Sequence, residues 1–314
     1  MAIGFFQIVF AVGMLVWLWQ IFDGEQALVL LADAKPVWLV AALLILSFQT
    51  VLSALRWRIT AKHLGIKLSL KTALSEYYLA QLVNQALPGG IIGDASRAVR
   101  SRNEAGLLAA SQAVIFERLS GQAGLVIVTL TALAVAPWIP GGLDWPSWIL
   151  LTIAGIIVAL SFLFLSLSVI ARKSSGAVSR GLKSFGSAAK NVFSAPSSVW
   201  AHVGLSLGTA LCNVAGFTFA AWAVGSSLSF LTAMVLVPII LLAMLLPLTV
   251  GGWGLREGAA VALFPIAGLI AVEGLAASVL FGLVCLVAAL PGALFTRSTR
   301  SRDAANRESL RKPK

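Results

Sequence analysis

Long apolar runs recur along the whole chain and are separated by short polar segments. Crossing a bilayer as a helix takes about 20 mostly apolar residues. Six runs reach roughly that length: Ile3–Phe22, Val37–Leu55, Leu119–Pro137, Trp148–Ile170, Val199–Val224 and Leu275–Phe295. The pattern therefore predicts an all-α polytopic membrane protein with about six full transmembrane helices.

Two further apolar regions are interrupted by proline and glycine. The first stops after Leu87 and resumes at Gly106, and the second stops after Leu246 and resumes at Gly258. In lipid, an interrupted helix is tolerated only where protein or a cavity satisfies its free backbone groups. We therefore expect two re-entrant helical hairpins, over residues 73–116 and 231–272.

The composition agrees with a membrane protein and excludes most soluble classes. Hydrophobic residues make up 59% of the chain and charged residues 11%, against about 25% charged residues in soluble domains. The two cysteines lie in apolar runs, the two histidines are isolated, and we expect no metal site and no cofactor. Motifs of hydrolases and nucleotide-powered pumps are absent from the sequence, so the chain is not expected to be an enzyme.

The net charge of +11 is explained by where the basic residues lie. Most of them fall in the segments Arg56–Lys71, Arg172–Lys190 and Arg297–Lys314, each beside an apolar run. Cytoplasmic loops of membrane proteins carry such an excess of lysine and arginine. We therefore expect no nucleic-acid partner, both termini in the cytoplasm, and a first hairpin that opens to the cytoplasm while the second opens outward.

The chain then divides into two similar halves of opposite orientation. Residues 1–137 form the first inverted repeat, residues 138–170 the outer loop and start of the second, and residues 199–295 the rest of it. Residues 171–198 form a basic amphipathic segment, which we expect to lie as a helix on anionic lipids of the cytoplasmic surface. Residues 296–314 form a basic tail that we expect to be disordered. Inverted repeats with interrupted helices indicate a transport site near the bilayer midplane.

The hairpin tips carry the candidate binding chemistry. Glycine-rich turns let backbone amides converge on an anion, and a restarting helix adds its positive dipole end. Asp94 is expected to cap such a helix, and the arginines that follow suit a phosphate-bearing headgroup. A cationic group would instead meet Asp94, Glu117 and Glu257. The substrate-binding candidates are Pro88, Gly89, Gly90, Gly93, Asp94, Arg97, Arg100, Glu117, Arg118, Pro247, Gly251, Gly252, Trp253, Gly254, Arg256 and Glu257.

Glu117 and Arg118 lie where the first hairpin is expected to meet the third full span. Ionisable residues at such depth are functional candidates and are usually paired. Glu117 is expected to pair with Arg97, or Arg118 with Asp94. A purely structural ion pair at the cytoplasmic interface remains the alternative.

Three stretches give the chain a resemblance to a known family. They run from Pro88 to Arg97, through Glu117 and Arg118, and from Pro247 to Glu257. They resemble the lysylphosphatidylglycerol synthase transmembrane-region family, the flippase-like domains also found at the front of the multiple peptide resistance factor. The resemblance implies movement of an anionic or aminoacylated phospholipid, or a related amphiphile, between leaflets of a bacterial inner membrane. Because the sequence ends at Lys314, we expect the synthase domain and its chemistry to be absent.

Two other functions stay open at this point. One is an intramembrane enzyme, or an enzyme subunit, that acts on a polyprenyl-phosphate or a phospholipid. The other is a non-transporting scaffold for a separate lipid synthase.

Overall fold

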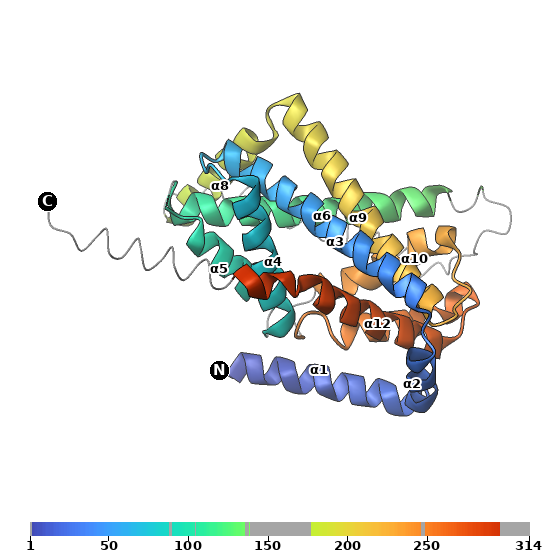
Figure 1. The fold of residues 1–314 in the computed structure, drawn as a ribbon. Helices are drawn as coiled ribbons and strands as arrows, with labels where there is room; N and C mark the ends of the chain where they lie inside the picture. The colour runs from blue at the N-terminus through green and yellow to red at the C-terminus, as the bar shows by residue number, and fades with distance from the viewer. Residues whose placement is uncertain are drawn as a thin grey trace, which may run out of the picture.

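The computed structural model describes residues 2–87, 90–103, 105–135, 138, 177–245 and 249–295. Within these ranges the chain is helical, with no strand (Figure 1). The helices are α1 (Ala2–Ile21), α2 (Gly24–Ala32), α3 (Pro36–His63), α4 (Leu70–Ala86), α5 (Ile92–Arg100), α6 (Gly106–Val135), α8 (Ala177–Phe193), α9 (Pro196–Ala223), α10 (Phe230–Leu242), α11 (Leu255–Leu263) and α12 (Ala271–Ala289). Two short 3₁₀ turns follow α10 and α11, at Ala243–Leu245 and Pro265–Ala267.

Five helices of the described residues are long and apolar enough to cross a membrane. They are α1, α3, α6, α9 and the helix that starts with α12 and continues to Phe295. Five of the six predicted runs are thus confirmed as helices of spanning length. The sixth, Trp148–Ile170, lies outside the described residues.

The core of the bundle forms around α9, half of whose apolar window is buried. Helix α3 runs beside α9 (Figure 1). The two helices approach closely at Gly216 of α9, where an added Cβ would lie 2.8 Å from the Leu46 side chain of α3. The ring of Phe217 in α9 packs at a tilt against the rings of Phe264 and Phe281 in the second half. Helix α9 therefore packs against elements of both halves of the chain.

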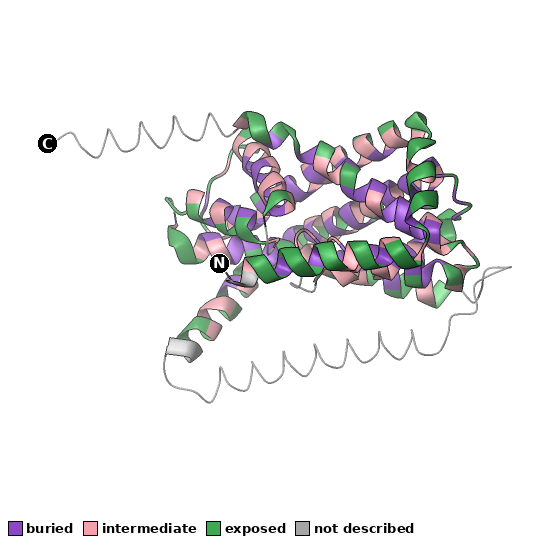
Figure 2. Cartoon of the chain, turned by 90° about the horizontal axis from the view of Figure 1, so that it is seen from below, coloured by how far each residue is buried: buried purple, intermediate pink, exposed green. Residues whose placement is uncertain are grey.

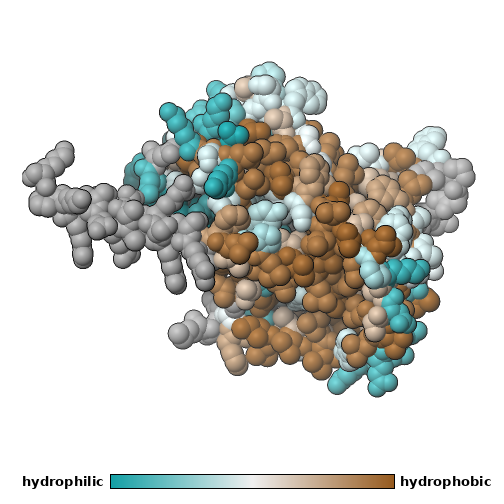
Figure 3. Space-filling model, in the orientation of Figure 1, coloured by the Kyte–Doolittle hydropathy of each residue, from teal (hydrophilic) through white to brown (hydrophobic). Residues whose placement is uncertain are grey.

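The surface of the bundle is suited to lipid. Figure 3 shows a broad apolar area across the middle of one face, with hydrophilic side chains gathered toward opposite corners. Helix α1 is the most peripheral span, and Figure 2 shows exposed residues along its length. Phe5 is 72% exposed and Trp17 54%. Such apolar exposure is unfavourable in water but expected where acyl chains cover the protein.

The predicted end of the first hairpin is wrong. Residues 106–116 do not form its returning arm, because α6 is one continuous helix of 30 residues from Gly106 to Val135. The hairpin is shorter, with α4 and α5 as its arms. Glu117 and Arg118 do not interrupt α6, since ion pairs with neighbouring helices satisfy both charges. The predicted end of the second hairpin is also shifted, because α12 already begins at Ala271.

The turn that leads into each hairpin has the same geometry in both halves. Gly65 and Gly225 follow α3 and α9 with φ values of 82° and 84°. Four residues later Ser69 caps α4 and Ser229 caps α10, each accepting a hydrogen bond of 3.1 Å from the backbone N–H of a threonine three residues on. A glycine turn followed by a serine cap therefore begins both α4 and α10.

Within the basic amphipathic segment, α8 is helical as predicted from Ala177 to Phe193, while residues 171–176 lie outside the described residues. Part of its apolar face is covered by protein. Ala188 and Val192 of α8 are buried with Phe116 of α6. The rings of Phe185 and Phe116 lie 4.6 Å apart. Part of the apolar face of α8 therefore packs on protein, through Phe116, while its placement on anionic lipids stays a prediction.

Candidate functional site

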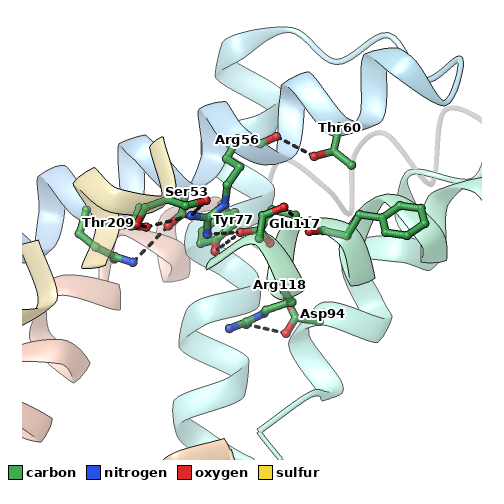
Figure 4. A network of polar contacts seen from close by, with 12 residues as sticks. Ser53, Arg56, Thr60, Tyr77, Asp94, Glu117, Arg118 and Thr209 are labelled. Atoms are coloured by element: carbon green, nitrogen blue, oxygen red, sulfur yellow. Dashed lines mark hydrogen bonds and ion pairs between the residues drawn. The ribbon is translucent and has the colours of Figure 1, made fainter. Parts of the chain in front are cut away.

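A buried carboxylate on α6 is the centre of a polar network that joins five helices (Figure 4). Glu117 is fully buried. Its Oε1 accepts hydrogen bonds from Arg56 Nη2 at 2.8 Å and from the Tyr77 hydroxyl at 3.2 Å. Its Oε2 accepts one from Arg97 Nη2 at 3.1 Å. One carboxylate thus pairs with two arginines from different helices.

A second carboxylate extends this network to the tip of the first hairpin. Asp94 Oδ1 accepts a hydrogen bond from Arg97 at 3.0 Å, and its Oδ2 accepts one from Asn84 at 3.0 Å and pairs with Arg118. Both pairings expected for the Glu117-Arg118 dipeptide therefore occur together.

The expected capping role of Asp94 is wrong. Ile91 occupies the N-cap position of α5, and Asp94 is the third residue of the helix. Asn84 of α4 instead accepts the N–H of Gly93 at 2.7 Å. The Asp94 carboxylate is engaged by two arginines, which bind it more strongly than a backbone amide would.

Arg97 is enclosed on every side. Its guanidinium carbon lies 4.4 Å from the centre of the Trp57 ring and 4.5 Å from that of Tyr77. The side chain is fully buried, and its Nε and Nη1 have no hydrogen-bond partner among the described residues. Two aromatic faces compensate part of the lost hydration of the cation.

Arg56 belongs to the site although the sequence reading assigned it to a basic cytoplasmic loop. It lies inside α3, is 4% exposed, and donates to Thr209 of α9 at 2.8 Å as well as to Glu117. A helical stripe of polar residues contains it. The stripe is Gln49, Ser53, Arg56 and Thr60. That three-to-four-residue spacing was the signal that could have identified Arg56 as an inward-facing residue of a longer helix.

Arg100 is separate from this network. Its Nε donates to Glu76 of α4, and the pair is partly buried, with the Arg100 side chain 23% exposed. This ion pair joins α5 to α4, and Arg100 does not contact the cluster around Glu117.

The tip of the second hairpin carries a closed cluster of its own. Glu257 Oε1 accepts hydrogen bonds from Arg256 Nη2 at 2.6 Å and from the Ser278 hydroxyl at 2.9 Å, while its Oε2 accepts the N–H of Gly254 at 2.6 Å. The Arg256 guanidinium lies 5.0 Å from the Trp253 ring and 5.4 Å from that of Phe281. Both ends of the Glu257 carboxylate are therefore occupied.

The two tips meet. A Cβ placed on Gly251 would lie 3.2 Å from Gln85 Oε1 and 3.7 Å from the carbonyl oxygen of Asn84. Gly251, Gly252 and Gly254 have φ values of 57°, 83° and 89°, a region that favours glycine. The chain can therefore turn tightly against the end of α4, which places the second tip beside the first hairpin.

The predicted site residues fall into two clusters and a remainder. Gly93, Asp94, Arg97, Glu117 and Arg118 gather at the first tip. Gly252, Trp253, Gly254, Arg256 and Glu257 gather at the second, while Gly90 follows the first turn with a φ of 60°. Pro88, Gly89 and Pro247 lie outside the described residues.

The backbone amides expected to bind an anion are partly used within the protein. The N–H of Gly93 bonds to Asn84 and that of Gly254 bonds to Glu257. The cationic side chains are therefore the stronger candidates for contact with a headgroup.

Comparison with known proteins agrees with this architecture. A family model described as the lysylphosphatidylglycerol synthase TM region matches residues 4–292. A comparison with curated proteins finds no match. Because the match covers nearly the whole helical bundle and both hairpin tips, the chain belongs to the lysylphosphatidylglycerol synthase transmembrane-region family.

Proposed function

We propose that this membrane protein is a lipid flippase that moves an anionic or aminoacylated phospholipid, or a related amphiphile, between leaflets. The headgroup would pass the two adjoining hairpin tips while the acyl chains stay in lipid. The observation that carries the proposal is the buried network of Arg56, Arg97, Asp94 and Glu117 inside an apolar bundle, which the more exposed Arg118 joins through Asp94.

Such a network is costly for a protein that only needs to be stable. Buried ion pairs often stabilise no better than apolar side chains of the same volume, because desolvation offsets their attraction. In membrane proteins, buried ionisable groups usually mark the path of a polar substrate. The concentration of charge at one hairpin tip favours transport of a polar headgroup over a purely structural role.

The repeated features of the two halves support an inverted-repeat transporter. The capped turns at Ser69 and Ser229 lead into hairpins whose second arms, α5 and α11, have 9 residues each. Helices of that length cannot cross a bilayer. Each second arm also carries an arginine held by a carboxylate and covered by aromatic rings. We propose that both hairpins are re-entrant, with the termini in the cytoplasm and the protein in a bacterial inner membrane.

Arg97 and Arg256 hold the tips in this arrangement. Their guanidiniums are buried and paired with carboxylates, so each fixes the position of its tip. If the tips handle the headgroup, removing either arginine should slow transport strongly even where the protein still folds.

Exchange of fluorescent phosphatidylglycerol in proteoliposomes tests this proposal. Arg97→Ala and Arg256→Ala should each slow leaflet exchange by at least about tenfold, the effect of losing one charge-assisted contact. Arg102→Ala, at an exposed arginine just after α5, is the matched control and should exchange like the wild type. Unchanged rates for both buried-arginine variants, in protein verified as folded, would refute the assignment of the site.

A further inference from the structure

Arg118 differs from the other arginines of the first tip in its exposure. Its side chain is 45% exposed, against 4% for Arg56 and 0% for Arg97. It also lies at the edge of the apolar surface of α6, where Ile115 is 44% and Leu119 53% exposed. A ligand can therefore reach this guanidinium without opening the buried network.

Arg118 lies well inside α6, a helix long and apolar enough to cross a membrane. It follows Gly106, the first residue of α6, by twelve positions, or about 18 Å at the helical rise of 1.5 Å per residue. The hydrocarbon core of a bilayer is about 30 Å thick. Inside such a helix an exposed arginine is expensive unless an anion pairs with it, as Asp94 does here.

The ion pair of Arg118 is the one in this network that can be exchanged at low cost. Asp94 would keep its bonds to Arg97 and Asn84 if Arg118 turned away. Release of Glu117, by contrast, would leave Arg56 and Arg97 as buried charges without their shared partner. Breaking a buried pair on one side is strongly unfavourable.

We propose that Arg118 is the residue that first binds the phosphate of the lipid headgroup, by exchanging its partner Asp94 for the phosphodiester at the lipid-facing edge of the first hairpin. The guanidinium suits this exchange because it binds phosphate and carboxylate with the same paired N–H donors. The inference rests on the proposed function and names the place where its substrate is captured. The exposed apolar neighbours favour a phosphate attached to a lipid over free phosphate.

Binding to the purified protein in detergent tests this role, with dioctanoyl phosphatidylglycerol as the probe. Arg118→Gln should weaken binding by about tenfold or more, and Arg118→Lys by less, because lysine keeps the charge but not the paired donors. Asp94→Asn should bind the probe more tightly, because the competing carboxylate charge is gone. Arg102→Gln, the matched loss of an exposed arginine, should bind like the wild type.

Two further probes separate the sources of the phosphate. Uncharged dioctanoylglycerol should bind the wild type and Arg118→Gln equally, and inorganic phosphate should bind the wild type far more weakly than the lipid does. Equal affinity of wild type and Arg118→Gln for dioctanoyl phosphatidylglycerol would overturn the proposal, as would weaker binding by folded Asp94→Asn. Inorganic phosphate binding as tightly as the lipid would overturn the assignment to a lipid headgroup.

The outcome is distinguishable from failure of the proposed function. Leaflet exchange by the wild type, with normal probe binding by Arg118→Gln, would refute the role of Arg118 alone. Arg118-dependent binding without any exchange by the wild type would refute flipping and leave the binding residue in place.

Discussion

Glu117 shows how a charge can be kept inside an apolar bundle. A carboxylate removed from water is stable only when its attraction to nearby cations and its hydrogen bonds offset the desolvation penalty. Glu117 has two arginines and a tyrosine hydroxyl within hydrogen-bonding distance. Because Arg56, Arg97 and Tyr77 come from three different helices, the carboxylate also joins α3, α4 and α5 to α6.

Neutralising this carboxylate should destabilise the protein. Glu117→Gln leaves the buried Arg56 without a counter-charge and Arg97 with Asp94 alone, and loss of one partner from a buried pair costs about 3–5 kcal/mol. Unfolding of purified protein in detergent measures the effect. Glu76→Gln is the matched control, since its partner Arg100 is partly exposed and the loss should be smaller. A Glu76→Gln variant that is as unstable as Glu117→Gln would contradict this view of the network.

The sequence predicted which charged residues lie together better than it predicted the contacts that each one makes. Asp94, Arg97, Glu117 and Arg118 were expected to lie together, because rare charges in apolar surroundings must find one another. The contribution of Asn84 was not foreseen, since the geometry that lets its amide replace Asp94 as a cap depends on how α4 and α5 pack. Gly93 permits this packing: an added Cβ would lie 2.0 Å from the carbonyl oxygen of Ala80.

At the scale of helices, the sequence predicted which segments are helical but not where they join. Glu117 and Arg118 suggested the end of a hairpin because charges usually mark a membrane surface. In the structure their partners come from α3 and α5, segments distant along the chain, so α6 continues through them. Tertiary pairing of this kind leaves no local signal.

The caps of α4 and α10 offer a direct test of the repeated design. Ser69→Ala and Ser229→Ala each remove a side-chain acceptor from a helix N-terminus, which should cost about 1 kcal/mol. The two losses should be similar because the two junctions have the same hydrogen bonds. Ser187→Ala, whose exposed hydroxyl bonds only within α8, should change stability by less than about 0.5 kcal/mol. Unequal losses at the two caps, measured by unfolding in detergent, would count against equivalent junctions.

At the scale of the molecule, the distribution of polar and apolar surface determines how the bundle can sit in a membrane. The apolar area in Figure 3 lies between hydrophilic ends. Arg180, Lys183 and Lys190 are exposed on α8, opposite the side that packs against Phe116. A helix held by protein on one side and basic on the other suits the headgroups of an anionic leaflet.

The proposed orientation can be measured with single cysteines. In a Cys212→Ser, Cys285→Ser background, Lys35→Cys should react with an impermeant thiol reagent added to intact cells, and Lys183→Cys should react only after the membrane is permeabilised. Both lysines are exposed in the structure, so access depends on the side of the membrane. The reverse labelling would contradict the orientation that the basic segments predict.

The central claim, movement of a phospholipid between leaflets, is tested most directly by adding protein to vesicles in increasing amounts. Vesicles with fluorescent phosphatidylglycerol in both leaflets are treated with an impermeant reductant, which bleaches only the outer leaflet. We predict that bleaching rises above the outer-leaflet share as the protein-to-lipid ratio increases, and that Arg97→Ala protein gives no such rise. Bleaching that stays at the outer-leaflet share at every ratio, with protein verified as folded and inserted, would contradict the account.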